Sequence, residues 1–93
     1  MKITLVKKVL EDGSPCAKCG DVQEKLDQKD QMRFIDETVI ADVRDENSRG
    51  MELAREHKVD RAPFFIVERE GGEAEIYTVY FKFAKEVLGP MEK

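Results

Sequence analysis

The chain contains two cysteines, Cys16 and Cys19, whose C-x-x-C spacing is its clearest chemical feature. Residues three apart lie on neighbouring turns of one helix face, so the two thiols would meet if a helix begins here. Their Cα atoms would then be roughly 5–6 Å apart, a separation that a disulfide accepts. The pair is therefore predicted to form a reversible intramolecular disulfide.

A thiol at the start of a helix reacts readily because its thiolate is favoured there. The unpaired backbone amides of the first turn and the positive charge of Lys18 both favour the thiolate of Cys16. Glu11 and Asp12 in the preceding loop oppose it, but water and salt screen carboxylates that face solvent. We therefore expect Cys16 to be the catalytic nucleophile, with Lys18 stabilising its thiolate. Cys19, deeper in the helix and with the higher pKa, is expected to be the resolving thiol.

The elements that must position the pair lie on either side of it. An apolar run with β-branched residues predicts a strand over Lys2–Lys8, and helix-forming residues follow the pair over Ala17–Gln31. Two starts of this helix are compatible with the sequence. Either Ser14 is the N-cap and Pro15 occupies the first turn, or Cys16 is itself the N-cap.

The remaining elements follow from apolar periodicity and turn signals. They are a strand over Thr38–Val43, a helix from Asn47 or Ser48 to Lys58, a strand over Phe64–Val67, a return strand over Ala74–Tyr80 after the Gly71-Gly72 turn, and a helix from Tyr80 that Gly89-Pro90 ends. The order β-α-β-α-β-β-α predicts one α/β domain, residues 1–93, in which helices cover a four-stranded mixed sheet. The first two strands should be parallel, and the Gly-Gly turn should join an antiparallel pair.

Composition narrows the classes of function. A net charge of −4 argues against a nucleic-acid partner, because phosphates would be repelled on average. Lysines interrupt the N-terminal apolar run, and no run approaches the length of a membrane span. We therefore expect a cytoplasmic protein without a membrane partner, and we expect it to be a monomer. In the cytoplasm, a close cysteine pair is more often redox-active or metal-binding than structural.

The pair also has other interpretations. C-x-x-C is half of a structural zinc site, but there is no second cysteine pair. Because His57 is the single histidine, a zinc site would require it together with a carboxylate, or ligands from a second chain. His57 itself is expected at the surface or at a helix end, without a catalytic role. Two inert cysteines in the core are a further interpretation. The alternative function is a binding or redox-sensing module that uses the pair for a metal or an iron–sulfur cluster.

Four phenylalanines lie in the second half of the chain. At their spacings such residues belong to the core more often than to a partner surface. We therefore favour the core over a partner surface, which is the other interpretation, for Phe64, Phe65, Phe81 and Phe83.

A second motif, Arg61-Ala62-Pro63, stands before the apolar strand, and its Pro63 lies 44 positions after Cys19. Together with the Cys16-Ala17-Lys18-Cys19 helix start and the Gly-Gly hairpin, it resembles the thioredoxin/glutaredoxin superfamily over nearly the whole chain. The resemblance implies a thioredoxin-like fold and reduction of protein disulfides without a bound cofactor. It also implies that the Ala62–Pro63 bond is cis and faces the cysteines, and that the Ala62 backbone pairs with an extended substrate.

Three departures from the family patterns bear on the electron donor. Pro15 stands where thioredoxins usually carry tryptophan, and Gly13 stands near the position of the glutaredoxin lysine. Tyr77-Thr78-Val79 replaces the second glycine pair with which glutaredoxins hold glutathione. The donor is therefore expected to be a reductase or a low-molecular-weight thiol, and a reductase fits better than glutathione.

Overall fold

The computed structural model describes residues 1–92 of the 93-residue chain. Its elements are β1 (Lys2–Val9), α1 (Ala17–Gln28), the 3₁₀ turn η1 (Met32–Phe34), β2 (Glu37–Asp42), α2 (Arg49–Glu56), β3 (Phe64–Glu68), β4 (Glu75–Tyr77), α3 (Tyr80–Phe83), the π-helical turn η2 (Ala84–Leu88) and α4 (Gly89–Met91). The last three are contiguous and form the final helical segment. The predicted order β-α-β-α-β-β-α is confirmed.

The four strands form one mixed sheet in the order β2-β1-β3-β4. β1 runs parallel to β2, with Val6 opposite Val39. It runs antiparallel to β3, with Val6 opposite Phe64, and β3 pairs with β4 in the predicted antiparallel hairpin. Both the parallel and the antiparallel pair of the sequence analysis are therefore confirmed.

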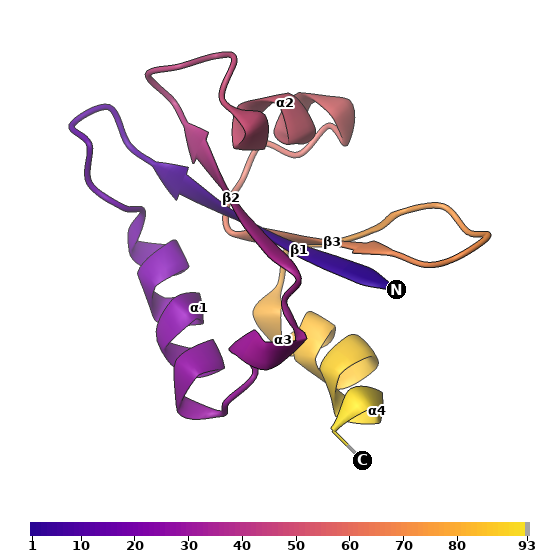
Figure 1. Cartoon of the computed structure of the whole chain (residues 1–93). Helices are drawn as coiled ribbons and strands as arrows, with labels where there is room; N and C mark the ends of the chain where they lie inside the picture. The colour runs from indigo at the N-terminus through magenta and orange to yellow at the C-terminus, as the bar shows by residue number, and fades with distance from the viewer. Residues whose placement is uncertain (93) are drawn as a thin grey trace.

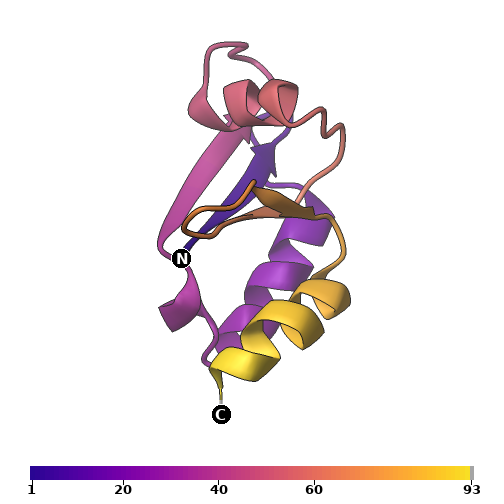
Figure 2. The same cartoon turned by 90° about the vertical axis from the view of Figure 1, so that its right-hand side faces the viewer.

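Helices cover both faces of the sheet, which gives three layers (Figures 1 and 2). α2 lies on one face, while α1 and the C-terminal helical segment lie on the other. Alternation along β1 sends Ile3 and Leu5 into the core beneath α1 and α3, and Val6 into the smaller core beneath α2. The same alternation places the side chain of Lys7 on the α1 side and that of Lys8 on the α2 side.

The phenylalanines divide differently from the prediction. Phe64, Phe65 and Phe83 are buried, and the rings of Phe65 and Phe83 stack with centroids 3.8 Å apart. Phe81 is 65% exposed, so its predicted place in the core is wrong. The reason is helical geometry: Tyr80 and Phe83 turn the same face of α3 to the core, and Phe81 projects from the opposite side.

The first helix is shorter than predicted. α1 ends at Gln28 because Asp30 adopts a left-handed backbone with φ of 54°. The N–H of Gln31 then turns back to donate to the carbonyl of Leu26 at 2.8 Å, as in a Schellman motif.

The second helix ends in the same way. Lys58 has φ of 57°, and the N–H of Val59 donates to the carbonyl of Ala54 at 2.8 Å. α2 therefore stops at Glu56, two residues before the predicted end. Its N-cap is Ser48, one of the two predicted starts.

The C-terminal boundary was predicted wrongly. Gly89-Pro90 does not end the last helix, which continues to Met91. The backbone widens into η2, where the N–H of Gly89 donates to the carbonyl of Ala84 five residues earlier. Pro90 then falls in the first turn of α4, directly after η2.

Two further details define the scaffold. The return strand is shorter than predicted, because Thr78 and Val79 leave the sheet to start α3.

Gly50 lets α2 approach β2 closely, since a Cβ added there would overlap the backbone of Ile40 and Ala41. In residues 1–92, no helix has the length and apolarity needed to span a membrane.

Candidate functional site

Cys16 is the N-cap of α1. Its backbone is extended, with φ of −68° and ψ of 141°, and its Sγ accepts a hydrogen bond from the N–H of Cys19 at 3.2 Å. Its own N–H donates to the carbonyl of Lys8 at 3.1 Å, which ties the start of the helix to β1. The alternative N-cap is wrong, because the Ser14 hydroxyl donates instead to the Asp12 carboxylate. The side chain that caps the first turn of α1 is thus the thiol of Cys16.

The two sulfurs of the pair lie 2.8 Å apart, and both are free thiols. Cys16 is partly exposed, whereas Cys19 is only 1% exposed. A disulfide bond of about 2.05 Å would require only a small approach of the sulfurs. The arrangement presents one accessible thiol backed by one buried thiol.

Burial is the main cause that raises the pKa of Cys19 to about 11. Its hydrogen bond with the Cys16 sulfur and the charge of that neighbour raise the pKa further. Two features of β1 act in the opposite direction: the N–H of Lys8, which donates to the Cys19 sulfur at 3.3 Å, and the charge of Lys7. Cys19 is buried, as expected, and at neutral pH this thiol keeps its proton.

Lys7 is a site residue that the sequence analysis missed. Its Nζ donates to the Gln23 Oε1 on α1 at 3.0 Å, and its charge acts on Cys19. Alternation along the first strand contained the signal, since Lys7 shares a face with Leu5. Lys18 is exposed, and within residues 1–92 no hydrogen bond or ion pair joins it to either sulfur.

Ala62 and Pro63 come from the loop before β3 and lie beside the cysteines. The Ala62–Pro63 bond is cis, as the resemblance implies. The carbonyl oxygen of Ala62 is 3.9 Å from the Cys16 Sγ although the residues are 46 positions apart. The structure thus brings together the two motifs that the sequence analysis singled out.

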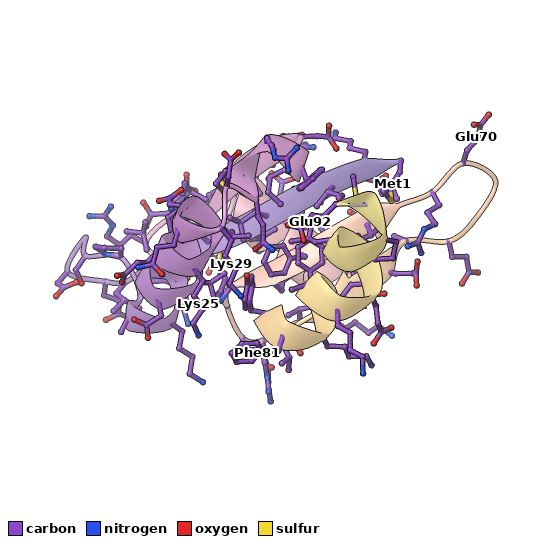
Figure 3. All side chains as sticks on the ribbon, turned by 90° about the horizontal axis from the view of Figure 1, so that it is seen from below. Met1, Lys25, Lys29, Glu70, Phe81 and Glu92 are labelled. Atoms are coloured by element: carbon purple, nitrogen blue, oxygen red, sulfur yellow. The ribbon has the colours of Figure 1, made fainter. Side chains whose placement is uncertain are left out.

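A groove of about 290 Å³ runs from Ala62 and Pro63 between α1 and the start of α3. Lys18, Lys25 and Arg61 line it together with Asp21, so its charge is mainly positive. The exposed Phe81 forms its far wall, and the Lys25 Nζ lies 4.8 Å from the centre of that ring (Figure 3). The groove therefore combines cationic and aromatic contacts beside the accessible thiol. We name it the α1 groove.

The described residues, 1–92, contain no group of three or more His, Cys, Asp or Glu side chains placed to hold a metal ion. His57 is the C-cap of α2, the helix-end position expected for it. A metal bound by the cysteine pair would need further ligands from a second chain or from a bound small molecule.

Comparison with known proteins finds no match to this chain among family models, curated proteins or solved structures. The chain is a small α/β protein with a four-stranded mixed sheet and a close Cys16–Cys19 pair.

Proposed function

We propose that this chain is a thiol–disulfide oxidoreductase of the thioredoxin/glutaredoxin type, which reduces protein disulfides through Cys16 and Cys19. The observation that carries the proposal is the pair itself: an accessible sulfur at the start of α1, 2.8 Å from a buried one. The element order and the position of Ala62 beside Cys16 support the same family.

The first step uses Cys16 as the nucleophile. Its thiolate attacks one sulfur of a substrate disulfide, forms a mixed disulfide and expels the other substrate sulfur as a thiolate. The N–H of Cys19 already points at the Cys16 sulfur and stabilises its negative charge before attack. Lys18, one residue into α1, adds a positive charge near this end of the helix.

The second step uses Cys19, whose proton must first be lost. In the mixed disulfide Cys16 carries no charge, so the hydrogen bond and repulsion that raise the pKa of Cys19 disappear. The Lys8 N–H and the Lys7 charge remain, and both favour the Cys19 thiolate. The expelled substrate thiolate takes the proton. The Cys19 thiolate then attacks the Cys16 sulfur, which expels the second substrate sulfur as a thiolate and leaves a Cys16–Cys19 disulfide.

The reaction transfers two electrons from the cysteine pair to the substrate. An external dithiol reductase or a low-molecular-weight thiol must return them to complete the cycle. No bound cofactor takes part in either step.

In the proposed reaction, the substrate segment lies beside the cysteine pair, along Ala62. An extended chain pairing with the Ala62 backbone would bring its disulfide to the Cys16 sulfur, 3.9 Å from the Ala62 carbonyl. Its neighbouring residues would enter the α1 groove.

The test is reduction of insulin disulfides in the presence of dithiothreitol. We expect turnover by the wild type, loss of turnover in Cys16→Ser, and a stable mixed disulfide in Cys19→Ser that mass spectrometry detects. Replacing dithiothreitol by glutathione, or by a reductase with its cofactor, distinguishes the two donors. A folded, reduced wild type without turnover would refute the proposal.

Metal analysis of anaerobically purified protein tests the alternative function. Stoichiometric zinc or iron that is lost in Cys16→Ser would favour a metal-binding or cluster-binding module. Metal-free protein with turnover supports the oxidoreductase.

A further inference from the structure

A second cavity, which the proposed reaction does not use, lies on the other side of Ala62. It is a hollow of about 350 Å³ between α2 and the sheet. Its apolar wall is formed by Ala41, Val43, Met51, Ala54, Val59 and Phe64. We name it the α2 hollow.

The packing of α2 explains why the hollow exists. Gly50 holds the first turn of α2 against the backbone of β2, so the helix is anchored at its N-terminal end. Further along, Met51, Leu53 and Ala54 of α2 pack against the sheet core. Of these, only the unbranched Met51 and the small Ala54 line the hollow, together with Ala41 of β2. These side chains leave space that larger residues would fill. Its size is at the lower end of the range for small-molecule sites.

The rim of the hollow is cationic although the protein carries a net charge of −4. Lys8, Arg55, Lys58 and Arg61 line it, against the single carboxylate of Asp60. The Asp60 Oδ1 lies 4.0 Å from the Arg61 Nε and offsets the charge of that arginine. In the described part of the chain, the other three rim cations form no ion pair. An anionic group at the rim would therefore find unpaired positive charge.

Lys58 occupies a backbone position that usually belongs to glycine. It is the left-handed residue of the motif that ends α2, with φ of 57°. A non-glycine residue pays a conformational cost there, which a glycine would avoid. Strained residues of this kind cluster at ligand sites, and here the strained residue supplies one of the rim cations.

We infer that the α2 hollow binds a small molecule with a compact apolar body and one anionic group, such as an aryl- or alkyl-carboxylate. The body contacts the apolar wall, and the carboxylate lies at the rim near Lys58 and Arg55. The site is independent of the thiol chemistry, although Ala62 and Lys8 border both sites.

The test is an NMR titration of reduced ¹⁵N-labelled protein with 3-phenylpropionate. We expect shifts in the amides of residues around the hollow, such as Val59, and a dissociation constant on the order of 1 mM or lower for a ligand of this size. The neutral 3-phenylpropanamide should bind about tenfold more weakly, and acetate should cause no shifts, because recognition needs both the charge and the apolar body. High salt should weaken phenylpropionate binding.

Matched variants locate the charge. Lys58→Gly keeps the helix end and removes a rim cation, and should weaken phenylpropionate binding at least about threefold. Asp30→Gly makes the same backbone change at the end of α1, away from the hollow, and should leave binding unchanged. Cys16→Ser should bind phenylpropionate like the wild type, so failure of the oxidoreductase proposal would not affect this result.

Several outcomes would overturn the inference. These are the absence of shifts, equal binding of the acid and its amide, shifts confined to the α1 groove, or unaltered binding in Lys58→Gly. An acidic, phenylalanine-containing peptide that occupies the hollow at least about tenfold more tightly than phenylpropionate would also overturn it, because the hollow would then be a site for polypeptides.

Discussion

The backbone N–H of Lys8 donates a hydrogen bond to the sulfur of Cys19 across 3.3 Å, so β1 holds the buried thiol directly. The carbonyl of the same residue accepts a hydrogen bond from the N–H of Cys16. The peptide group before Lys8 therefore contacts Cys19, and the peptide group after it contacts Cys16. The strand positions the pair as much as the helix does.

The raised pKa of Cys19 predicts a loss of stability in alkali. Since the pKa is raised from 9.0 to about 11, the folded state holds this proton more tightly than the unfolded state. The stabilisation is complete below pH 9 and is lost as the pH rises through about 11. The loss should be on the order of 2 kcal/mol. Urea unfolding of reduced protein at increasing pH measures it.

The control for this measurement is Cys19→Ala, which removes the titrating group. The variant should be less stable at neutral pH, because it leaves a small cavity, but its stability should fall less between neutral and alkaline pH. Parallel pH profiles for the two proteins would show that Cys19 does not contribute.

Lys7 is expected to tune the buried thiol. Lys7→Met removes the positive charge that lowers the pKa of Cys19, so the Cys19 thiolate should form at higher pH than in the wild type. Ultraviolet absorbance of the thiolate measures this shift. If the proposed reaction is correct, the resolving step should slow about two- to tenfold, and mixed disulfides should accumulate. Lys8→Met is the matched control, because its side chain lies on the opposite face of the sheet. An unchanged titration in Lys7→Met would contradict the role of Lys7.

Two glycine substitutions should have opposite effects on stability. Gly50→Ala places a methyl group against the backbone of β2, which cannot move cheaply, and should destabilise the fold by about 2–4 kcal/mol. Gly20→Ala, in the exposed part of α1, meets no atom within 4 Å and should stabilise by about 0.5–1 kcal/mol. Equilibrium unfolding in urea compares them. Equal effects would mean that α2 does not depend on close contact with β2.

Lys58→Gly should stabilise the protein by about 0.5–1 kcal/mol, because glycine adopts the left-handed backbone at φ of 57° without steric cost. Asp30→Gly should gain less, since aspartate tolerates this conformation better than lysine. Thermal unfolding of both variants measures the difference. A destabilised Lys58→Gly would show that the lysine side chain contributes more to the fold than its backbone costs.

Periodicity and turn residues were sufficient to predict the order of elements, the parallel pair of the first two strands and the antiparallel hairpin. The apolar runs at Ile3–Val6 and Phe64–Val67 predicted two of the strands, and the Gly-Gly turn predicted the hairpin. The spacing of Cys16 and Cys19 likewise predicted their contact. These features depend on local pattern, which sequence shows directly.

Features that depend on contacts between distant segments were not predicted. The close approach at Gly50 depends on β2, and the effect of Lys7 on Cys19 depends on how α1 docks on β1. Each requires a packing geometry that no local pattern specifies.

The opposite orientation of Lys7 and Lys8 makes β1 sensitive to misalignment. If β1 slipped by one residue against its neighbours, the two lysines would exchange faces. The Lys7 ammonium would then leave Gln23 on the α1 side, where its charge favours the Cys19 thiolate, and Leu5 would leave the core beneath α1. The buried thiol would also lose the amide that now contacts it. The pairing of Val6 with Val39 and Phe64 therefore aligns the core and the buried thiol at once.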